Sequence, residues 1–199
     1  YASAIKRFVS NAELHFLAGE IPPDASTLFE EDSHQHEIKE IRGFADWSLY
    51  DDFYKTKHTE GSEVYRELFH RFWQETLVIF QKLGKYIEEN NIQLLYTLNT
   101  SSHPGNVSLA LATVLLSEYL QLPVISNNHE FYWEGGSRPE KNKQKVGSRD
   151  HFFTNAHISD FFSLIERLFP WESRSWFNIN VNRNQSKRLI EKKGHNPAN

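Results

Sequence analysis

A dense group of polar and aromatic side chains follows the apolar segment 123–126. It brings amides, carboxylates, a histidine and aromatic rings into one short run, namely Asn127, Asn128, His129, Glu130, Tyr132, Trp133 and Glu134. Amides and carboxylates pair with hydroxyl groups through hydrogen bonds, and aromatic faces cover the C–H sides of a sugar ring. A purely structural loop would hold fewer large aromatics among so many donors and acceptors. The run therefore predicts a binding site for a hydroxyl-rich ligand.

A second candidate lies in the polar segment 101–106, immediately before a predicted helix. His103, Gly105 and Asn106 stand there, and the helix start offers unpaired N–H groups and a positive dipole end. Gly105 allows close approach of the backbone to a phosphate or a hydroxyl-rich ligand. The structural alternative is equally well founded: Asn106 is the N-cap of the helix, and Gly105 is a turn residue. Both interpretations stay open at this point.

Metal and cofactor motifs are weak in this sequence. The run His34-Gln35-His36 offers two imidazoles, which is half of what zinc needs, and no matching third ligand is spaced nearby. It is interpreted as a solvated strand entry, and no metal or cofactor is expected. His129 and Glu130 are adjacent at a strand end, where neighbouring side chains tend to point apart. The glycine-rich motifs of dinucleotide and P-loop enzymes and the Gly-x-Ser-x-Gly elbow of hydrolases do not occur.

Composition narrows the function classes. The chain has 199 residues, which fits one large domain, and its 39% hydrophobic and 14% aromatic content argues against disorder. A net charge of −4 gives no basic field for a nucleic acid. The absence of cysteine excludes disulfides and thiolate chemistry and suits a cytoplasmic protein. The longest uncharged apolar run, 107–117, is too short for a transmembrane segment.

Short apolar segments alternate with helical patterns along the chain. Strands are expected at 14–19, 36–41, 92–98, 123–126 and 176–180. Helices are expected at 1–10, 25–31, 62–90, 107–120, 158–169 and 184–193, the last closed by Gly194, with an exposed loop at 134–149. This order predicts an α/β fold: a three-layer, Rossmann-like domain with a mainly parallel sheet and helices on both faces. Ligands of such sheets bind in the loops after the strands, here 99–106, 126–136 and 180–184.

The stretch from Ile92 to Gly136 resembles glycosyltransferase family 4, the retaining transferases built from two Rossmann-like domains. In their N-terminal domain a strand, a loop with a histidine and a helix of Ala and Leu precede a strand that ends in His-Asp. Here the corresponding features are the His103 loop, the segment 107–120 and the pair His129-Glu130, with Glu in place of the commoner Asp. Towards the end, segments 178–182, 185–189 and 194–197 follow the family's order of elements.

The resemblance implies that residues 1–199 are the N-terminal, acceptor-side domain of such an enzyme, inactive by itself. The family's first strand with its glycine-rich loop and its C-terminal nucleotide-sugar domain would lie outside the chain. The implied reaction moves a sugar from a nucleotide-sugar donor to a hydroxyl of a small polar or carbohydrate acceptor, without a cofactor. By position, His129 would contact the transferred sugar as the catalytic residue. The acceptor pocket would be formed by His103, Asn106, Asn128, Glu130, Tyr132 and Trp133.

Two other functions fit the same sequence. One is a non-catalytic carbohydrate- or nucleotide-binding module with a flavodoxin-like sheet. The other is an interaction domain that uses the aromatic-rich helix 62–90, including Trp73, as a partner surface. Since fold class does not fix function, all three are carried forward.

Overall fold

Every strand pair in the described part of the chain is parallel. The computed structural model describes residues 2–29, 33–54, 56, 58–134 and 167–199. Strands β3 (Leu95–Leu98), β4 (Val124–Asn128) and β5 (Trp176–Asn180) form a sheet in the order β3-β4-β5, and β1 (His15–Ala18) pairs with β2 (His34–Glu37) in a separate two-stranded sheet. The predicted α/β class with parallel strands and a Rossmann-like alternation is confirmed. The single sheet that the sequence suggested is divided in two.

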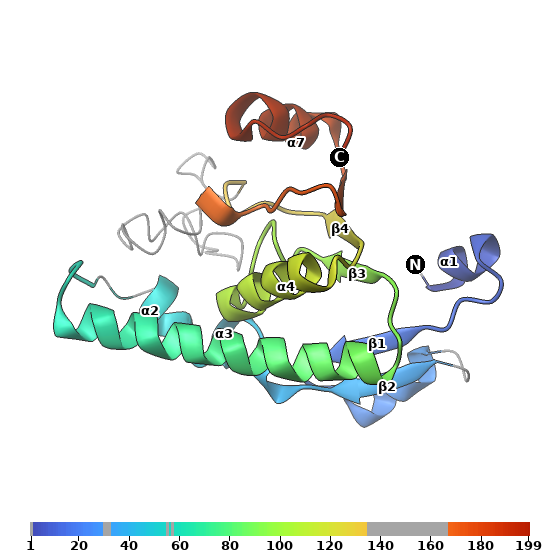
Figure 1. The fold of residues 1–199 in the computed structure, drawn as a ribbon, viewed down its shortest axis with the longest axis horizontal. Coiled ribbons are helices and arrows are strands. Elements are labelled where there is room, and N and C mark those ends of the chain that lie inside the picture. Colours follow the sequence, from blue (N-terminus) through green and yellow to red (C-terminus); the bar gives the residue numbers. More distant parts are fainter. Residues whose placement is uncertain (1, 30–32, 55, 57, 135–166) are drawn as a thin grey trace, which may run out of the picture.

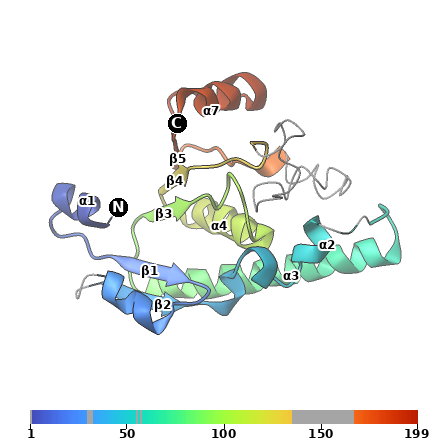
Figure 2. The same cartoon turned by 180° about the vertical axis from the view of Figure 1, so that it is seen from behind.

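The helices follow the expected alternation. In chain order they are α1 (Ala2–Phe8), η1 (Pro23–Leu28), α3 (Glu63–Glu89), α4 (Val107–Leu120), α7 (Arg183–Arg188) and its π-helical continuation η6 (Leu189–Lys193). Gly194 has a φ of 75° and closes that last helix, as predicted. Figures 1 and 2 show α3 and α4 packed together along the strands, with α7 beyond β5. The predicted loop 134–149 and helix 158–169 fall almost wholly outside the described residues.

Segment 36–54 differs most from the prediction. Strand β2 ends at Glu37 instead of continuing to residue 41, because Ile38 turns into the core and the chain enters a 3-10 turn. Three short helices follow that the sequence did not indicate: η2 (Lys39–Ile41), η3 (Phe44–Asp46) and α2 (Tyr50–Tyr54). The segment from Trp47 to the end of α2 supplies a large part of the core, namely Trp47, Leu49, Tyr50, Phe53 and Tyr54. Each helix is too short to show a period in the sequence, so tertiary burial decides their form.

Helix α3 is the longest element, and its amphipathic pattern sets the layers. Ser62 begins it as N-cap by accepting a hydrogen bond from the Tyr65 N–H. The helix runs unbroken through Gly84, where an added Cβ would lie 3.2 Å from Cδ1 of Leu116 on α4. The glycine therefore marks the close approach of α3 and α4. None of the helices in the described ranges is both long and apolar enough to cross a membrane.

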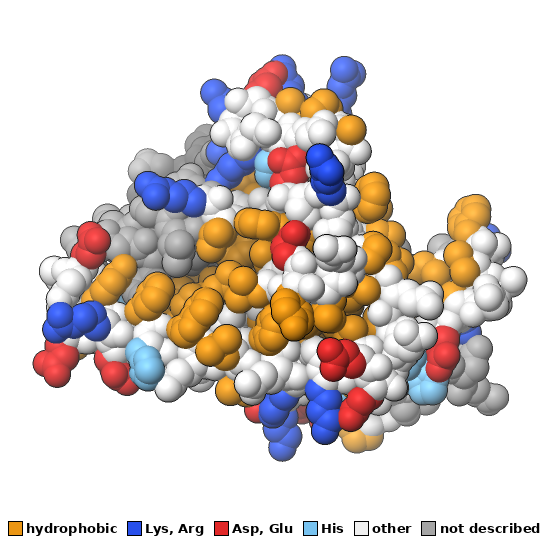
Figure 3. All heavy atoms as spheres, in the orientation of Figure 1, with side chains coloured by type: hydrophobic (Ala, Val, Ile, Leu, Met, Phe, Trp, Pro, Cys, Tyr) orange, Lys and Arg blue, Asp and Glu red, His pale blue; other side chains and the backbone are white. Residues whose placement is uncertain are grey.

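One face of α3 and α4 exposes hydrophobic side chains. Figure 3 shows them as a band across the side of the molecule on which these helices lie. On α3, Phe69, Trp73 and Leu77 are 42%, 41% and 40% exposed, and on α4 Tyr119 is 75% exposed. The ring of Tyr119 contacts that of Phe80 edge-on at 6.1 Å between centroids. The aromatic stripe of the sequence thus has an inner, core-forming side and an outer side that stays at the surface.

Strand β5 is anchored to α4 by a buried polar contact. The indole Nε1 of Trp176 donates a hydrogen bond of 2.9 Å to Oγ of Ser117, and Ser117 in turn donates to the Val114 carbonyl. Both side chains are completely or almost completely buried. Removal of the donor at such a buried place leaves the acceptor unsatisfied. The free-energy penalty of the unsatisfied group exceeds the net stabilisation that the hydrogen bond gives.

We expect Trp176→Phe to lower the free energy of unfolding by roughly 1–3 kcal/mol, from the lost hydrogen bond and the smaller ring. Urea denaturation followed by circular dichroism measures the change. Phe177→Leu is the matched control, since Phe177 is the next residue of β5 and 51% exposed; it should change the value by less than about 0.5 kcal/mol. Equal losses in the two variants would contradict the anchoring role of Trp176.

Candidate functional site

The loops that follow β3 and β4 lie side by side because these strands are parallel neighbours. The register pairs Leu98 with Asn127, and the N–H of Asn99 donates to the Asn127 carbonyl at 3.0 Å. Past this point the chain leaves the sheet at the same edge in both strands. The predicted loops 99–106 and 126–136 are thereby brought together, as the rule for parallel sheets requires.

Asn99 joins the two loops through its side chain. Its Oδ1 accepts hydrogen bonds from the backbone N–H of His129 at 2.8 Å and of Glu130 at 3.2 Å. Asn99 has a φ of 55°, a left-handed conformation that asparagine adopts more readily than most residues. This residue was missed in the sequence, although an asparagine directly after a buried strand is a turn signal. It fixes the backbone that presents His129 and Glu130.

His103 and Glu130 come from the two loops and face each other. Nδ1 of His103 lies 3.8 Å from Oε2 of Glu130, and the His103 side chain is 6% exposed against 32% for Glu130. The His103 ring packs edge-on against Phe44 at 5.9 Å. An imidazole beside a carboxylate can exchange a proton or share a hydroxyl group between them. The two loops thus bring an imidazole and a carboxylate together at the strand ends.

His129 is half-buried, and its backbone is held on both sides. Its N–H donates to Asn99, and its carbonyl accepts from Nε2 of Gln185 at 3.2 Å. Gln185 belongs to the capping box of α7, in which Asn182 accepts from the Gln185 N–H and the Gln185 side chain accepts from the Asn182 N–H. The third predicted loop, 180–184, is therefore coupled to the second through the start of α7.

Asn106 acts as a structural connector. Its Oδ1 caps α4 by accepting from the Leu109 N–H at 2.8 Å, and its Nδ2 donates to the carbonyls of Glu40 and Arg42 at 3.0 and 2.8 Å. The N-cap interpretation is confirmed. Because these bonds are all internal and the residue is 3% exposed, Asn106 supports the site from below.

The glycine at position 105 is explained by a contact within the protein. A Cβ at this position would lie 2.7 Å from Cε2 of Phe44, and the Phe44 N–H donates to the Gly105 carbonyl at 2.7 Å. The close backbone approach that the sequence suggested for a ligand is made here by Phe44. Phe44 itself has a φ of 52°, which is strained for a bulky side chain.

Asn128 lies inside β4, since the strand continues past the predicted end at 126. Its amide is completely buried, donates to Oδ1 of Asn178 and of Asn180 at 3.1 Å each, and accepts from the Ser126 hydroxyl at 3.0 Å. Asn180 passes the network on to Ser186 of α7 at 3.0 Å. Side chains that are this fully bonded fix the relation of β4, β5 and α7.

Tyr132 and Trp133 belong to the hydrophobic core. Both are buried, and the Tyr132 hydroxyl accepts a hydrogen bond of 2.7 Å from Nζ of Lys193. Trp133 stacks on Phe131 at 4.5 Å, and the Arg188 guanidinium lies 5.1 Å from its ring centroid. These rings therefore tie the loop to the last helix. Of the site residues predicted from the sequence, the partly exposed ones are His129 and Glu130.

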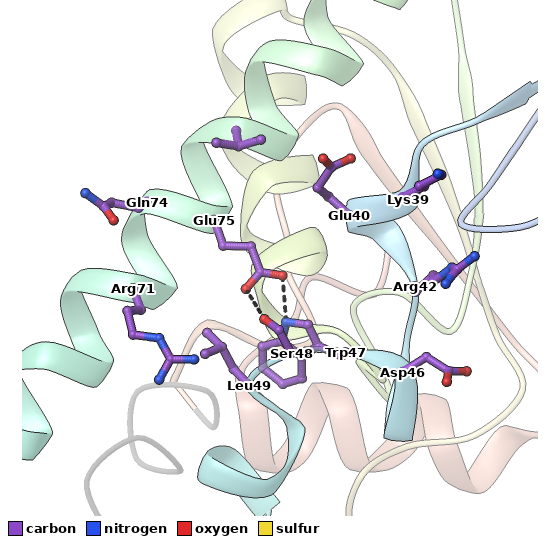
Figure 4. Close-up of a pocket in the computed structure, with 11 residues that line it drawn as sticks. Lys39, Glu40, Arg42, Asp46, Trp47, Ser48, Leu49, Arg71, Gln74 and Glu75 are labelled. Atoms are coloured by element: carbon purple, nitrogen blue, oxygen red, sulfur yellow. Dashed lines mark hydrogen bonds between the residues drawn. The ribbon is translucent and has the colours of Figure 1, made fainter.

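A separate open groove of about 460 Å³ lies between α3 and segment 39–49. Figure 4 shows the Glu75 side chain pointing across it, where it accepts hydrogen bonds from Nε1 of Trp47 at 3.0 Å and from the Ser48 hydroxyl at 3.1 Å. Burial raises the pKa of the Glu75 carboxyl, and the bonds from Ser48 and Trp47 oppose that rise. None of the predicted site residues lines this groove. The strand-end loops and this groove are thus distinct features, and the site residues predicted from the sequence lie at the strand ends.

Comparison with known proteins gave no relatives: no protein-family model, curated protein or solved structure matches this chain.

Gly105→Ala should lower the free energy of unfolding by roughly 1–3 kcal/mol, because its methyl group would overlap the Phe44 ring. The loss should shrink in a Phe44→Gly background, where the ring and the left-handed strain are both removed. A double-mutant cycle measured by chemical denaturation gives the coupling between the two positions. An equal cost of Gly105→Ala in both backgrounds would show that Phe44 is not what excludes a side chain at position 105.

The raised pKa of Glu75 predicts a pH dependence of stability. Between the ordinary carboxyl pKa and the raised native value, the native state holds more protons than the unfolded state. Ionised Glu75 therefore weakens the fold as pH rises from the ordinary carboxyl pKa through the raised native pKa, and Glu75→Gln should gain stability relative to wild type over that range. Ser48→Ala should steepen the wild-type fall, since it removes a bond that lowers the pKa. Denaturation curves at several pH values test this; parallel pH profiles for wild type and Glu75→Gln would refute it.

Proposed function

We propose that this chain is the acceptor-binding, N-terminal domain of a retaining glycosyltransferase that moves a sugar from a nucleotide-sugar donor to an acceptor hydroxyl. The observation that carries the proposal is the meeting of His103, His129 and Glu130 at the carboxyl ends of neighbouring parallel strands. The order of elements from β3 to the last helix agrees with the resemblance on which the proposal rests.

The proposed roles follow from exposure and bonding. His129 and Glu130 are the partly exposed members of the set, with their backbone fixed by Asn99. Glu130 and His103 together hold an acceptor hydroxyl, whose O–H donates a hydrogen bond to the Glu130 carboxylate. His129 contacts the transferred sugar. Asn106, Asn128, Tyr132 and Trp133 serve binding indirectly, by keeping this backbone in place.

Positioning is the physical contribution of such a domain to catalysis. Holding an acceptor hydroxyl in one orientation converts an encounter between two molecules into a reaction within one complex. Fixed hydrogen-bond donors in a partly dry site also stabilise charge that develops during transfer, without reorganising first. The nucleotide-sugar donor is proposed to bind a C-terminal domain, with the cytoplasm, which suits a cysteine-free chain, as the proposed location.

Two alternatives have discriminating observations. A carbohydrate- or nucleotide-binding module would bind its ligand with the chain alone and would need no donor. An interaction domain would use the exposed band of α3 and α4, and Trp73→Ser would then weaken association with a partner while leaving ligand binding unchanged.

The test is calorimetric titration of the chain with a panel of nucleotide sugars, free sugars, sugar phosphates and polyols. We expect weak binding of an acceptor and none of the nucleotide sugars. Glu130→Ala should weaken acceptor binding by about 3- to 10-fold, the value of one hydrogen bond. His70→Ala, an exposed histidine of α3, is the control and should bind as wild type does.

Tight binding of nucleotide sugars with no acceptor binding would overturn the assignment and favour the binding module. Unchanged acceptor binding by Glu130→Ala would remove Glu130 from the acceptor site.

A further inference from the structure

We propose a divalent transition-metal site, of the kind that holds Zn²⁺, built from Glu13, His15 and His34 where β1 and β2 begin. One ligand atom of each residue lies within 4.8 Å of those of the other two. The site is far along the chain from the strand-end loops, and the proposal does not depend on the proposed glycosyltransferase function.

The parallel register creates the set. His15 pairs with His34 across the two-stranded sheet, and their rings stack with centroids 4.4 Å apart at an angle of 16°. Glu13 precedes β1 and reaches the same point. The run His34-Gln35-His36 therefore supplies one ligand, and the other two come from His15 of the neighbouring strand and from Glu13 before it. His36 is not part of the set; its ring stacks on Tyr86 at 4.5 Å.

The distances suit a tetrahedral ion. Oε1 of Glu13 lies 2.8 Å from Nε2 of His34 and 3.6 Å from Nε2 of His15. Zinc bonds to nitrogen and oxygen of about 2.0–2.1 Å place neighbouring tetrahedral ligands roughly 3.3 Å apart. These two separations bracket this value, and the ligand nitrogens of His15 and His34 lie within 4.8 Å of each other. Because the two rings stack almost parallel, they would have to turn toward each other for both lone pairs to point at one ion.

A partner behind His15 orients it as a metal ligand. Nδ1 of His15 lies 2.8 Å from the Tyr86 hydroxyl on α3, and the His15 side chain is 7% exposed. When the Nδ1–H group donates a hydrogen bond to that hydroxyl, Nε2 carries the lone pair and faces Glu13. Ligating histidines in metalloproteins characteristically have such a hydrogen-bonded second nitrogen, which fixes ring and tautomer.

The ligand chemistry selects the ion. Two imidazole nitrogens and one carboxylate oxygen suit zinc and its first-row neighbours, whereas Ca²⁺ and Mg²⁺ require oxygen ligands. Glu13 and His34 are 67% and 52% exposed, so a fourth position would be open to water. Binding would join β1 to β2, whose ladder is only four residue pairs long and is weak by itself.

The experiment uses the untagged full chain, freed of metal with a chelator and titrated with Zn²⁺ in the presence of a competing chromophoric chelator. We expect one Zn²⁺ per chain and a rise in the thermal unfolding temperature. His34→Gln and Glu13→Gln, both at exposed positions, should remove or strongly weaken binding while circular dichroism without metal stays unchanged. Tyr86→Phe should weaken it about 10-fold through the lost partner of His15.

His70→Gln, at an exposed position of α3, is the matched control and should bind as wild type does. Co²⁺ in place of Zn²⁺ should give the strong visible absorption of a four-coordinate ion, and this absorption should disappear in His34→Gln. Absence of binding by the wild-type chain, retention of binding in both His34→Gln and Glu13→Gln, or its loss in His70→Gln would overturn the proposal.

Discussion

The parallel pairing of β3 with β4, locked by the Asn99 side chain, is the interaction on which the strand-end region depends. Backbone pairing brings the two strands to one edge, but it leaves the chain beyond Leu98 and Asn128 without ladder partners. Asn99 replaces those partners by accepting from the N–H groups of His129 and Glu130. Buried backbone groups must be satisfied somewhere, so the side chain that satisfies them also dictates where the loop goes.

Many of the polar residues that look like ligand contacts are committed to the protein itself. Asn106 joins α4 to segment 40–42, and Asn128 joins β4 to β5. Gln185 joins the start of α7 to Glu134 and to the His129 carbonyl. A buried amide has both donors and an acceptor to satisfy, so a strand-end region rich in amides builds its own framework first. Only side chains at the outer edge of that framework remain accessible to a ligand.

The two sheets of the molecule are stabilised by different kinds of contact. The β3-β4-β5 sheet is covered by α4 and held by buried amides and by Trp176. The β1-β2 pair lies against the later part of α3 and has exposed histidines and carboxylates on its strands. Without a large apolar face, such a pair relies on side-chain contacts between the strands, and the stacking of the His15 and His34 rings is one of these.

The sequence by itself determined the α/β class and the long elements. Helices α3 and α4 were predicted with boundaries within about a residue, because Ser62 and Asn106 are local capping signals and the apolar period is long. Strand β5 and the Gly194 helix end were determined for the same local reasons. The loops chosen as a site followed from the topological rule for parallel sheets, which needs only the order of elements.

Only the tertiary structure decided the rest. Helix α2 and its 3-10 neighbours form because Trp47, Phe53 and Tyr54 are buried by distant residues, which no window of sequence contains. Whether Asn106 and Asn128 face a ligand or the protein depended on carbonyls and amides more than forty residues away in the chain. The meeting of Glu13 and His15 with His34 is a matter of strand register. Local propensity is encoded within a few residues, whereas burial and register arise only when separate segments pack together.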